Sequence, residues 1–369
     1  NHTGITKNLE NNYKVFQMNP DIALKKIFAP EHGFFGEASA GAKVNYKNKN
    51  FKKAEILSLY GKNRKPTKKM LEGLDLIIYD IQDIGSRFYT YISTLGIVIE
   101  AAAEQDIEIM ILDRPNPING KIIEGAILDT SFKSFVGYYP IPIRYGLTVG
   151  ELTNMAINEN WLSPLPKKVT IVKMDGWRRS MFFDETNLPW IPPSPNIPNL
   201  ETAIVYPGMC LFEATNLSEG RGTYKPFLQI GAPWIKEDLI NQLKNLKLEG
   251  ININFTKFSP KTIPGKALNP KFENDTCYGS IFEIQEKHKY KSLETAIRKI
   301  SIINENYNDK FNFNSNTLNK LYGNNSLTNY LNTLSQSNNL NKQNSLLDLL
   351  HNEEKALKRF SKKSLKYYL

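Results

Sequence analysis

The residues of this sequence best suited to acid–base chemistry are the adjacent Glu31 and His32, in the segment Phe28-Ala-Pro-Glu-His-Gly-Phe-Phe-Gly36. A carboxylic acid beside an imidazole can supply both a proton donor and a proton acceptor. The glycines that follow allow the backbone to approach a ligand closely. The alternative interpretation is a tight turn that carries a solvated glutamate, and the segment by itself leaves both open.

Two further clusters of polar residues each follow an apolar stretch. Residues 74–79 and 107–112 are continuously or mostly apolar, which is typical of parallel strands buried on both faces. The clusters that follow them are Asp80, Gln82 and Asp83, and then Asp113, Arg114 and Asn116. Because ligands gather at the carboxyl edge of an open parallel sheet, we expect Glu31, His32 and both clusters to lie at one edge of one sheet. Capping of a helix, or pairing with Arg87 or Arg114, is an equal alternative for Asp83 and Asp113.

Carboxylic acids are numerous enough for glycoside hydrolysis. That reaction typically uses a pair of them on either side of the glycosidic bond, although substrate-assisted variants need only one. The acids placed for such a role are Glu31, Asp80, Asp83, Glu213 and Glu219. Aromatic residues that could stack on a sugar ring lie near the same loops, although a residue of this kind more often belongs to the core: Phe34, Tyr60, Tyr89, Tyr91, Tyr138 and Trp190.

The elements that would position these residues alternate between strand and helix. We predict strands at residues 24–28, 74–80, 107–112 and 169–174, and helices at residues 91–105 and 149–162. Strand, helix and strand in succession form a right-handed parallel crossover, so the chain is predicted to be α/β. We also predict a short strand at residues 203–206 and a long loop over the ligand edge at residues 38–53.

The character of the sequence changes near residue 228. Beyond it we predict helices at residues 236–246, 292–305 and 346–360, and strands at residues 251–258 and 276–284. These elements make a smaller α+β unit. We therefore expect a catalytic domain at residues 1–228 and a smaller α+β domain at residues 229–369.

Composition excludes several classes of protein. The chain has 369 residues and a net charge of +10, and it contains no run of about 18 apolar residues that would predict a transmembrane helix. Neither a phosphate-binding glycine motif nor a metal-ligand spacing occurs, so we expect no cofactor and no metal. The basic charge alone does not predict a nucleic-acid partner. Cys210 and Cys277 could pair or stay free, and no signal peptide is visible before Asn1.

Several longer motifs resemble the NamZ-type exo-β-N-acetylmuramidases, which are peptidoglycan glycoside hydrolases. These motifs are Ala-Pro-Glu-His-Gly-Phe, Ser-Leu-Tyr-Gly, Tyr-Asp-Ile-Gln-Asp-Ile-Gly-Ser-Arg-Phe-Tyr-Thr-Tyr, Leu-Asp-Arg-Pro-Asn-Pro-Ile, Pro-Pro-Ser-Pro-Asn-Ile-Pro and Asn-Leu-Ser-Glu-Gly-Arg-Gly-Thr. The match is tight over residues 1–233 and looser after Cys277. The resemblance implies a Rossmann-like first domain without a nucleotide, a smaller second domain and an active site in the cleft between them. It also implies release of N-acetylmuramic acid from non-reducing ends of peptidoglycan fragments, by a protein that is periplasmic, lipid-anchored or secreted.

On this resemblance Glu31 matches the proposed catalytic glutamate of the family, and His32, Asp80 and Asp83 join it as catalytic candidates. The candidates for binding the saccharide are Gln82, Arg87, Tyr89, Asp113, Arg114, Asn116, Ser194, Asn196, Glu213, Asn216, Glu219 and Arg221. Arg221, between two glycines, is our first choice for the lactyl carboxylate of the sugar, and Arg87 the second. The family often has His where this chain has Tyr145, so no role is assigned to that side chain. The alternative function is a cell-wall saccharide-binding protein that uses the same cleft without turnover.

Overall fold

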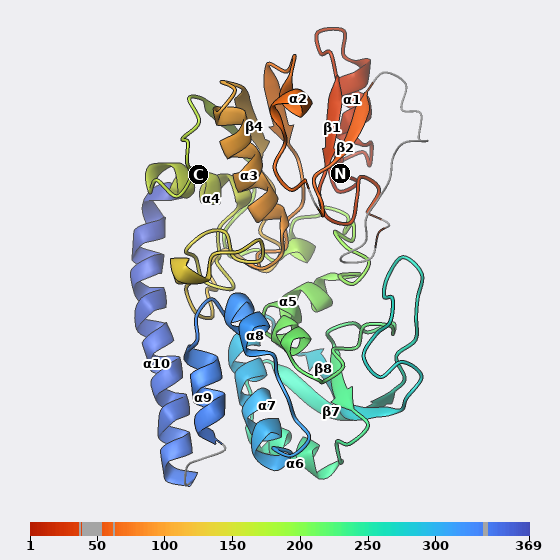
Figure 1. The fold of residues 1–369 in the computed structure, drawn as a ribbon, viewed down its shortest axis with the longest axis vertical. Helices are drawn as coiled ribbons and strands as arrows, with labels where there is room; N and C mark the ends of the chain where they lie inside the picture. Colours follow the sequence, from red (N-terminus) through yellow and green to blue (C-terminus); the bar gives the residue numbers. More distant parts are fainter. Residues whose placement is uncertain (37, 39–53, 62, 335–338) are drawn as a thin grey trace.

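The computed structural model describes residues 1–36, 38, 54–61, 63–334 and 339–369, with side chains omitted for residues 339–344. Apart from Ala38, the predicted loop at residues 38–53 lies outside the described residues. The chain folds into two units, one above the other in Figure 1, with the first half of the sequence above and most of the second half below. The long C-terminal helix α10 (Asn339–Ser364) runs alongside the lower unit and ends against the upper one.

Parallel strands form the centre of the upper unit. They are β1 (Lys26–Ala29), β2 (Glu55–Ser58), β3 (Leu76–Tyr79), β4 (Glu108–Leu112) and β5 (Val169–Val172). Each of the four strands predicted in this region is present, so the α/β class is confirmed. The expectation of one sheet was wrong for the described residues, because β1 pairs only with β2 and the order β3-β4-β5 forms a second sheet. A cavity of about 450 Å³, lined by residues 21–28 and 73–81, lies between the two sheets.

Helices cover these strands. They are α1 (Asn12–Met18), α2 (Lys68–Leu71), α3 (Tyr91–Ala103) and α4 (Val149–Asn158), with short 3₁₀ turns η1 (Thr130–Phe132) and η2 (Phe183–Glu185). Helix α3 buries most of its side chains, among them Ile92, Leu95 and Ile99, and so belongs to the core. Helix α4 begins with a capping box, in which Thr148 accepts a hydrogen bond from the Glu151 N–H and Glu151 accepts one from the Thr148 N–H.

The lower unit combines a small antiparallel sheet with helices. Its strands, in the order β6-β8-β7, are β6 (Gln229–Ala232), β7 (Ile251–Phe258) and β8 (Cys277–Ile284). Besides α10, its helical segments are α5 (Leu200–Met209), η3 (Cys210–Ala214), α6 (Asp238–Asn245), α7 (Ser292–Asn306), α8 (Ser315–Tyr322) and α9 (Ser326–Leu334). The short 3₁₀ turn η4 (Leu365–Tyr367), after α10, packs on α4 of the upper unit. The predicted strands and helices after residue 228 are therefore present. A smaller α+β unit at the C-terminal end agrees with the prediction.

The predicted strand at residues 203–206 is wrong, because these residues lie inside helix α5. The Asn199 side chain caps the helix by accepting a hydrogen bond from the Thr202 N–H at 2.9 Å. Gly208 lets the helix approach α7 closely: its N–H donates to Ser292 Oγ at 2.7 Å, and a Cβ there would lie 2.0 Å from the Ser292 carbonyl oxygen. Tertiary packing therefore overrides the strand preference of this β-branched stretch.

Cys210 and Cys277 are both free thiols and both buried. Within the described ranges, no helix is long and apolar enough to cross a membrane. The same residues include no group of three or more acids, histidines and cysteines arranged to hold a metal ion. The boundary near residue 228 stays a prediction, although α5 and η3, which precede it, pack on elements that follow it.

Candidate active site

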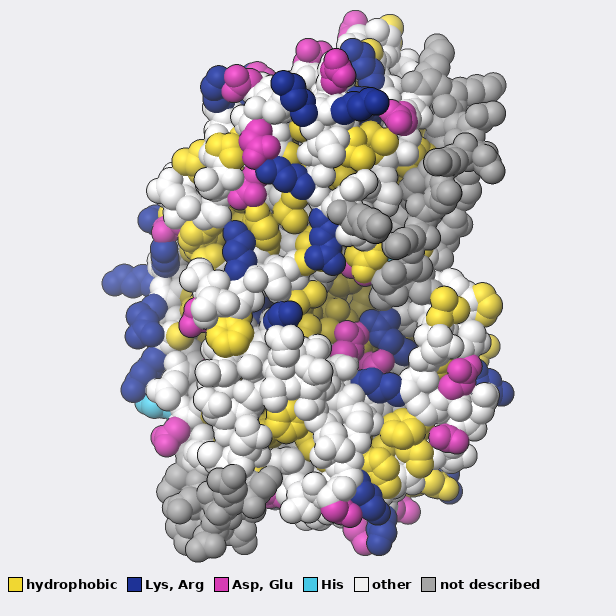
Figure 2. Space-filling model, in the orientation of Figure 1, with side chains coloured by type: hydrophobic (Ala, Val, Ile, Leu, Met, Phe, Trp, Pro, Cys, Tyr) yellow, Lys and Arg dark blue, Asp and Glu magenta, His cyan; other side chains and the backbone are white. Residues whose placement is uncertain are grey.

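A cavity of about 120 Å³ lies where the two units meet. Figure 2 shows this face of the molecule hollowed near its middle, with hydrophobic side chains inside the hollow and acidic and basic side chains together along its lower edge. Seven of the candidate residues line the cavity, and they come from separate parts of the sequence: Glu31, His32, Tyr89, Ser194, Asn196, Glu213 and Arg221.

Glu31 and His32 enter the cavity from the turn that follows β1. Thr90, just before helix α3, donates its hydroxyl hydrogen to Glu31 Oε2 at 2.7 Å. His32 adopts a left-handed backbone conformation with φ of +68°, which is uncommon for a residue with a side chain and typical of functional turns. Its Nδ1 lies 2.9 Å from the Ala38 carbonyl oxygen. Because that oxygen can only accept, Nδ1 carries the proton and Nε2 is the basic nitrogen.

Burial lowers the pKa of His32, with Arg221 acting in the same direction and Glu31 opposing it. The imidazole is therefore neutral near pH 7. Its ring stacks at 6.4 Å from the Tyr89 ring and meets the Tyr91 ring edge-on at 6.5 Å. These contacts fix the orientation of the imidazole at the cavity wall.

The opposite wall carries a cluster of charged groups from the lower unit. Arg221 donates to Glu213 Oε1 from Nη2 at 2.5 Å and from Nε at 3.2 Å, and its Nε lies 3.5 Å from Glu219. Lys271 in turn donates to Glu219 at 3.0 Å. Gly220 and Gly222 have positive φ values of 75° and 79°, which lets the loop turn sharply around Arg221. Although burial opposes it, the charges of Glu213 and Glu219 hold the pKa of Arg221 above its ordinary value.

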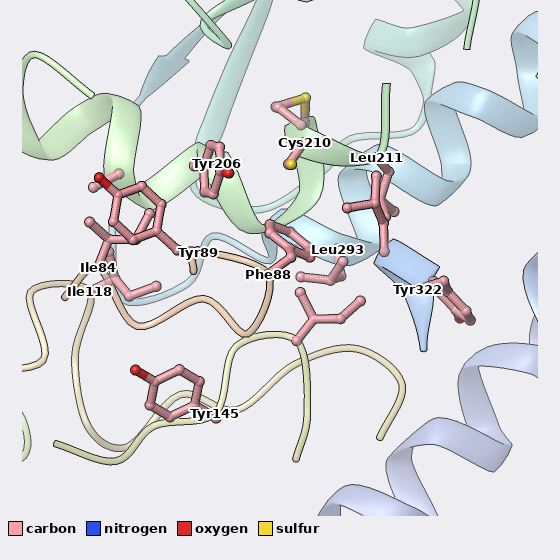
Figure 3. Close-up of a cluster of buried hydrophobic side chains, with 14 of the residues drawn as sticks. Ile84, Phe88, Tyr89, Ile118, Tyr145, Tyr206, Cys210, Leu211, Leu293 and Tyr322 are labelled. Carbon is pink, nitrogen blue, oxygen red and sulfur yellow. The ribbon is translucent and has the colours of Figure 1, made fainter. Parts of the chain in front are cut away.

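Aromatic rings close the cavity between these two walls. Tyr206 on α5 meets Phe88, Tyr89 and Phe227 edge-on, with ring centroids 5.5, 6.1 and 4.8 Å apart. Figure 3 shows Phe88 and Tyr89, from the loop of the upper unit, beside Tyr206 and Cys210 of the lower one. Edge-to-face pairs of this kind join the two units at the site itself.

The acids that follow β3 do not line the cavity. Asp80 accepts hydrogen bonds from Arg114 Nε at 2.6 Å and from Asn12. Gln82 donates to the carbonyl oxygens of Asp83 at 2.7 Å and Pro115 at 2.8 Å. Asp83 accepts from the Gly85 N–H at 2.7 Å and from the Tyr145 hydroxyl, and burial raises its pKa to about 6. These contacts brace the loop between β3 and α3.

Other candidates also serve the architecture rather than the cavity wall. Asp113 accepts from Thr148 Oγ1 at 2.6 Å and the Gly150 N–H at 2.8 Å, so it holds the start of α4. Asn116 donates to the Leu147 carbonyl oxygen at 2.9 Å, and Asn216 to that of Lys310 at 2.7 Å. Glu219 does not line the cavity, and its side chain forms ion pairs with Arg221 and Lys271.

Arg87 is fully buried, and its guanidinium contacts backbone carbonyl oxygens. Nη1 donates to the Ala126 and Ile141 oxygens at 2.7 Å each, and Nη2 donates to the Leu321 oxygen at 2.8 Å. Leu321 belongs to the lower unit and the other two residues to the upper one. Arg87 therefore ties the two units together behind the cavity, and it is not placed to bind a carboxylate there.

Eight residues that line the cavity were not among the candidates: Phe88, Thr90, Val136, Ile197, Tyr206, Cys210, Phe227 and Leu321. Thr90 directly follows the candidate Tyr89 in one of the motifs described above, so its place in that motif could have identified it. Tyr206, Phe227 and Leu321 come from segments whose local sequence carries no comparable signal. Only the packing of the lower unit brings them to Glu31.

Comparisons with known proteins find matches along the whole chain. The N-terminal and C-terminal family models of the exo-β-N-acetylmuramidase NamZ match residues 1–201 and 204–369. The peptidoglycan β-N-acetylmuramidase NamZ of Bacillus subtilis (strain 168) is 39% identical over 371 residues, which cover 100% of this chain and 85% of that protein.

Two crystal structures of DUF1343-family proteins from Bacteroides fragilis NCTC 9343 share the fold. They superpose with TM-scores of 0.87 and 0.75 at 33% and 32% identity, and each match covers 100% of this chain and 92% of the other. The resemblance predicted from the motifs is thus confirmed by matches that extend over both units. The chain belongs to the NamZ exo-β-N-acetylmuramidase family of glycoside hydrolases.

Proposed function

We propose that this protein is an exo-acting β-N-acetylmuramidase that releases N-acetylmuramic acid from non-reducing ends of peptidoglycan fragments, with Glu31 as the catalytic acid. The observation that carries the proposal is the position of Glu31 in the cavity between the units, with its carboxyl group held by Thr90. The activity named for the B. subtilis relative supports the same reaction. A small cavity also favours the end of a glycan chain over its middle.

In this reaction Glu31 gives its proton to the glycosidic oxygen while the bond from that oxygen to C1 breaks. Thr90 fixes one oxygen of the Glu31 carboxyl group, and this limits the orientations from which the proton can be transferred. The Tyr89 and Tyr206 rings supply flat apolar surfaces for the sugar. Ser194 and Asn196, both buried at the cavity wall, add hydrogen-bonding groups.

Arg221 is the group that we propose for the lactyl carboxylate of N-acetylmuramic acid. It lies in the cavity wall with 21% of its side chain exposed, and its planar guanidinium suits a carboxylate. Its existing contacts use Nε and Nη2, both on the side of Glu213 and Glu219. Since peptidoglycan lies outside the cytoplasmic membrane, we propose that the protein acts as a periplasmic, lipid-anchored or secreted enzyme.

The proposal is tested with a chromogenic aryl β-N-acetylmuramide and with muropeptide-derived disaccharides. Wild-type protein should release the sugar, and Glu31→Gln should fold and bind but lose about a hundredfold or more of the turnover. Near-normal turnover by folded Glu31→Gln would exclude Glu31 as the acid. Binding of the saccharide by wild-type protein without any release would instead favour the cell-wall-binding alternative.

A further inference from the structure

Two carboxylates from different units share the cavity. Of the five acids that the sequence offers for glycoside hydrolysis, Glu31 and Glu213 line it, whereas Asp80, Asp83 and Glu219 do not. Glu31 follows β1 of the upper unit, and Glu213 lies on η3 of the lower unit. The cavity therefore brings together a pair of acids that are 182 positions apart in the sequence.

The two carboxylates contact different kinds of group. Glu31 accepts a hydrogen bond from a neutral hydroxyl, whereas Glu213 forms an ion pair with Arg221. Both contacts of Arg221 go to Oε1 of Glu213. Among the described residues Oε2 has no hydrogen-bond partner, and 31% of the side chain is exposed. One oxygen is thus fixed in place, and the other is available to a ligand or to water.

We propose that Glu213 is the second catalytic carboxylate, acting as general base while Glu31 acts as general acid; this rests on the function proposed above. A water molecule adds its oxygen to C1 and transfers a proton to Glu213 Oε2. The bond from C1 to the glycosidic oxygen breaks, and that oxygen takes the proton of Glu31. Proton exchange with solvent then returns both groups to their starting states. Because water attacks opposite the leaving group, the first product is the α-anomer.

Glu219 is the natural comparison, because it belongs to the same ion-pair cluster without lining the cavity. It contacts Arg221 at 3.5 Å and Lys271 at 3.0 Å, and it is buried. Replacing it by glutamine removes one carboxylate from the cluster, as replacing Glu213 does. If only the Glu213 variants lose turnover, the cause is therefore the position of Glu213 in the cavity and not the changed charge of the ion-pair cluster.

The test measures turnover of the aryl β-N-acetylmuramide by Glu213→Gln, Glu213→Gly and Glu219→Gln, each checked for folding by its thermal midpoint. Both Glu213 variants should lose about a hundredfold or more, and Glu219→Gln much less. Azide should restore turnover of Glu213→Gly by entering the vacated space, and the product should be the α-glycosyl azide. A merely structural role of Glu213 predicts no rescue by azide.

Three results would overturn the assignment. The first is that folded Glu213→Gln keeps turnover within tenfold of the wild type while Glu31→Gln is inactive. That result would exclude Glu213 as the base without contradicting the proposed function. The second is a folded Glu213→Gly that azide does not accelerate. The third is a β-anomer as the first product of the wild-type reaction by NMR, which excludes a base that activates water opposite the leaving group. Absence of any release by wild-type protein would refute the proposed function itself.

Discussion

At the residue scale, the cavity separates the acids and bases that we propose to act on a ligand from those that hold the fold. Asp80, Asp83, Asp113 and Arg114 looked equivalent to Glu31 in the sequence, since each follows a strand. Their partners are other residues of the upper unit, such as the Gly85 N–H for Asp83 and Thr148 at the start of α4 for Asp113. Glu31 differs because it lines the cavity, where residues of the second unit lie opposite it. Sequence alone gave these acids equal standing, because which loop faces the second unit is a tertiary property.

Arg221 carries the prediction that belongs to this scale. Replacing it with lysine keeps a positive charge near Glu213 and Glu219 but removes the planar fork that suits a carboxylate. We expect Arg221→Lys to lower the ratio of kcat/KM for muramide over glucosaminide substrates by about tenfold or more, since a charge-assisted hydrogen bond contributes about 1.5–3 kcal/mol. Arg221→Ala should lower it at least as far.

The ratio needs no separate control for damage to Glu213, because such damage lowers kcat/KM for both substrates alike. Both substrates should be assayed under the same conditions with each variant. An unchanged ratio in both variants would mean that the lactyl carboxylate is bound elsewhere in the cavity.

At the element scale, periodic sequence patterns predicted those strands and helices whose formation depends on the local sequence. The apolar runs at β3 and β4 and the helical spacing in α3 are found within a few residues of their predicted bounds. Helix α5 was missed because its β-branched residues favour a strand and its Pro207 argues against a helix. The contact that decides the matter is with Ser292, which lies 84 residues from Gly208. No local pattern contains that information.

The contact between α5 and α7 gives a prediction at this scale. A Cβ at residue 208 would meet the Ser292 carbonyl oxygen, so Gly208→Ala must push α5 away from α7, and we expect it to destabilise the fold by about 2–4 kcal/mol. The measurement is the shift of the urea midpoint. Gly176→Ala is the comparison, because φ is +75° there and no other atom lies within 4 Å of the added methyl group. It should cost only about 1–2 kcal/mol of backbone strain. Equal shifts in the two variants would contradict the packing argument.

At the scale of the whole molecule, the candidate active-site cavity exists only because two units are held in a fixed relation. Arg87 was interpreted from the sequence as a substrate ligand, since it lies in a polar motif beside acidic residues. Its partners are three backbone carbonyl oxygens, and carbonyls leave no trace in a sequence. Gly323 makes room for its guanidinium, because a Cβ there would lie 2.6 Å from Nη2. The sequence therefore singled out Arg87 as a residue of interest, but it did not show that Arg87 joins the two units.

Helix α10 adds a second charged group to this junction. Glu353 on α10 has a buried Oε1 without a hydrogen-bond partner among the described residues. Burial raises the pKa of Glu353 from 4.5 to about 8, with Glu124 acting in the same direction and Arg87 opposing both. The folded protein thus holds a proton on Glu353 in a pH range where the unfolded chain has lost it.

This difference predicts how stability depends on pH. Between about pH 4.5 and pH 8 the folded state binds more protons than the unfolded state at Glu353, so this residue makes the free energy of unfolding fall as the pH rises, by at most about 1.4 kcal/mol per pH unit. Glu353→Gln cannot ionise, so the variant should gain stability relative to the wild type as the pH is raised from 5 to 8. Urea midpoints across that range measure the effect. Glu354→Gln, at the next position and paired with Lys358 on the exposed side of α10, should instead follow the wild-type curve. Parallel curves for Glu353→Gln and wild type would show that Glu353 binds protons alike in the folded and unfolded states over this range, and would contradict the prediction.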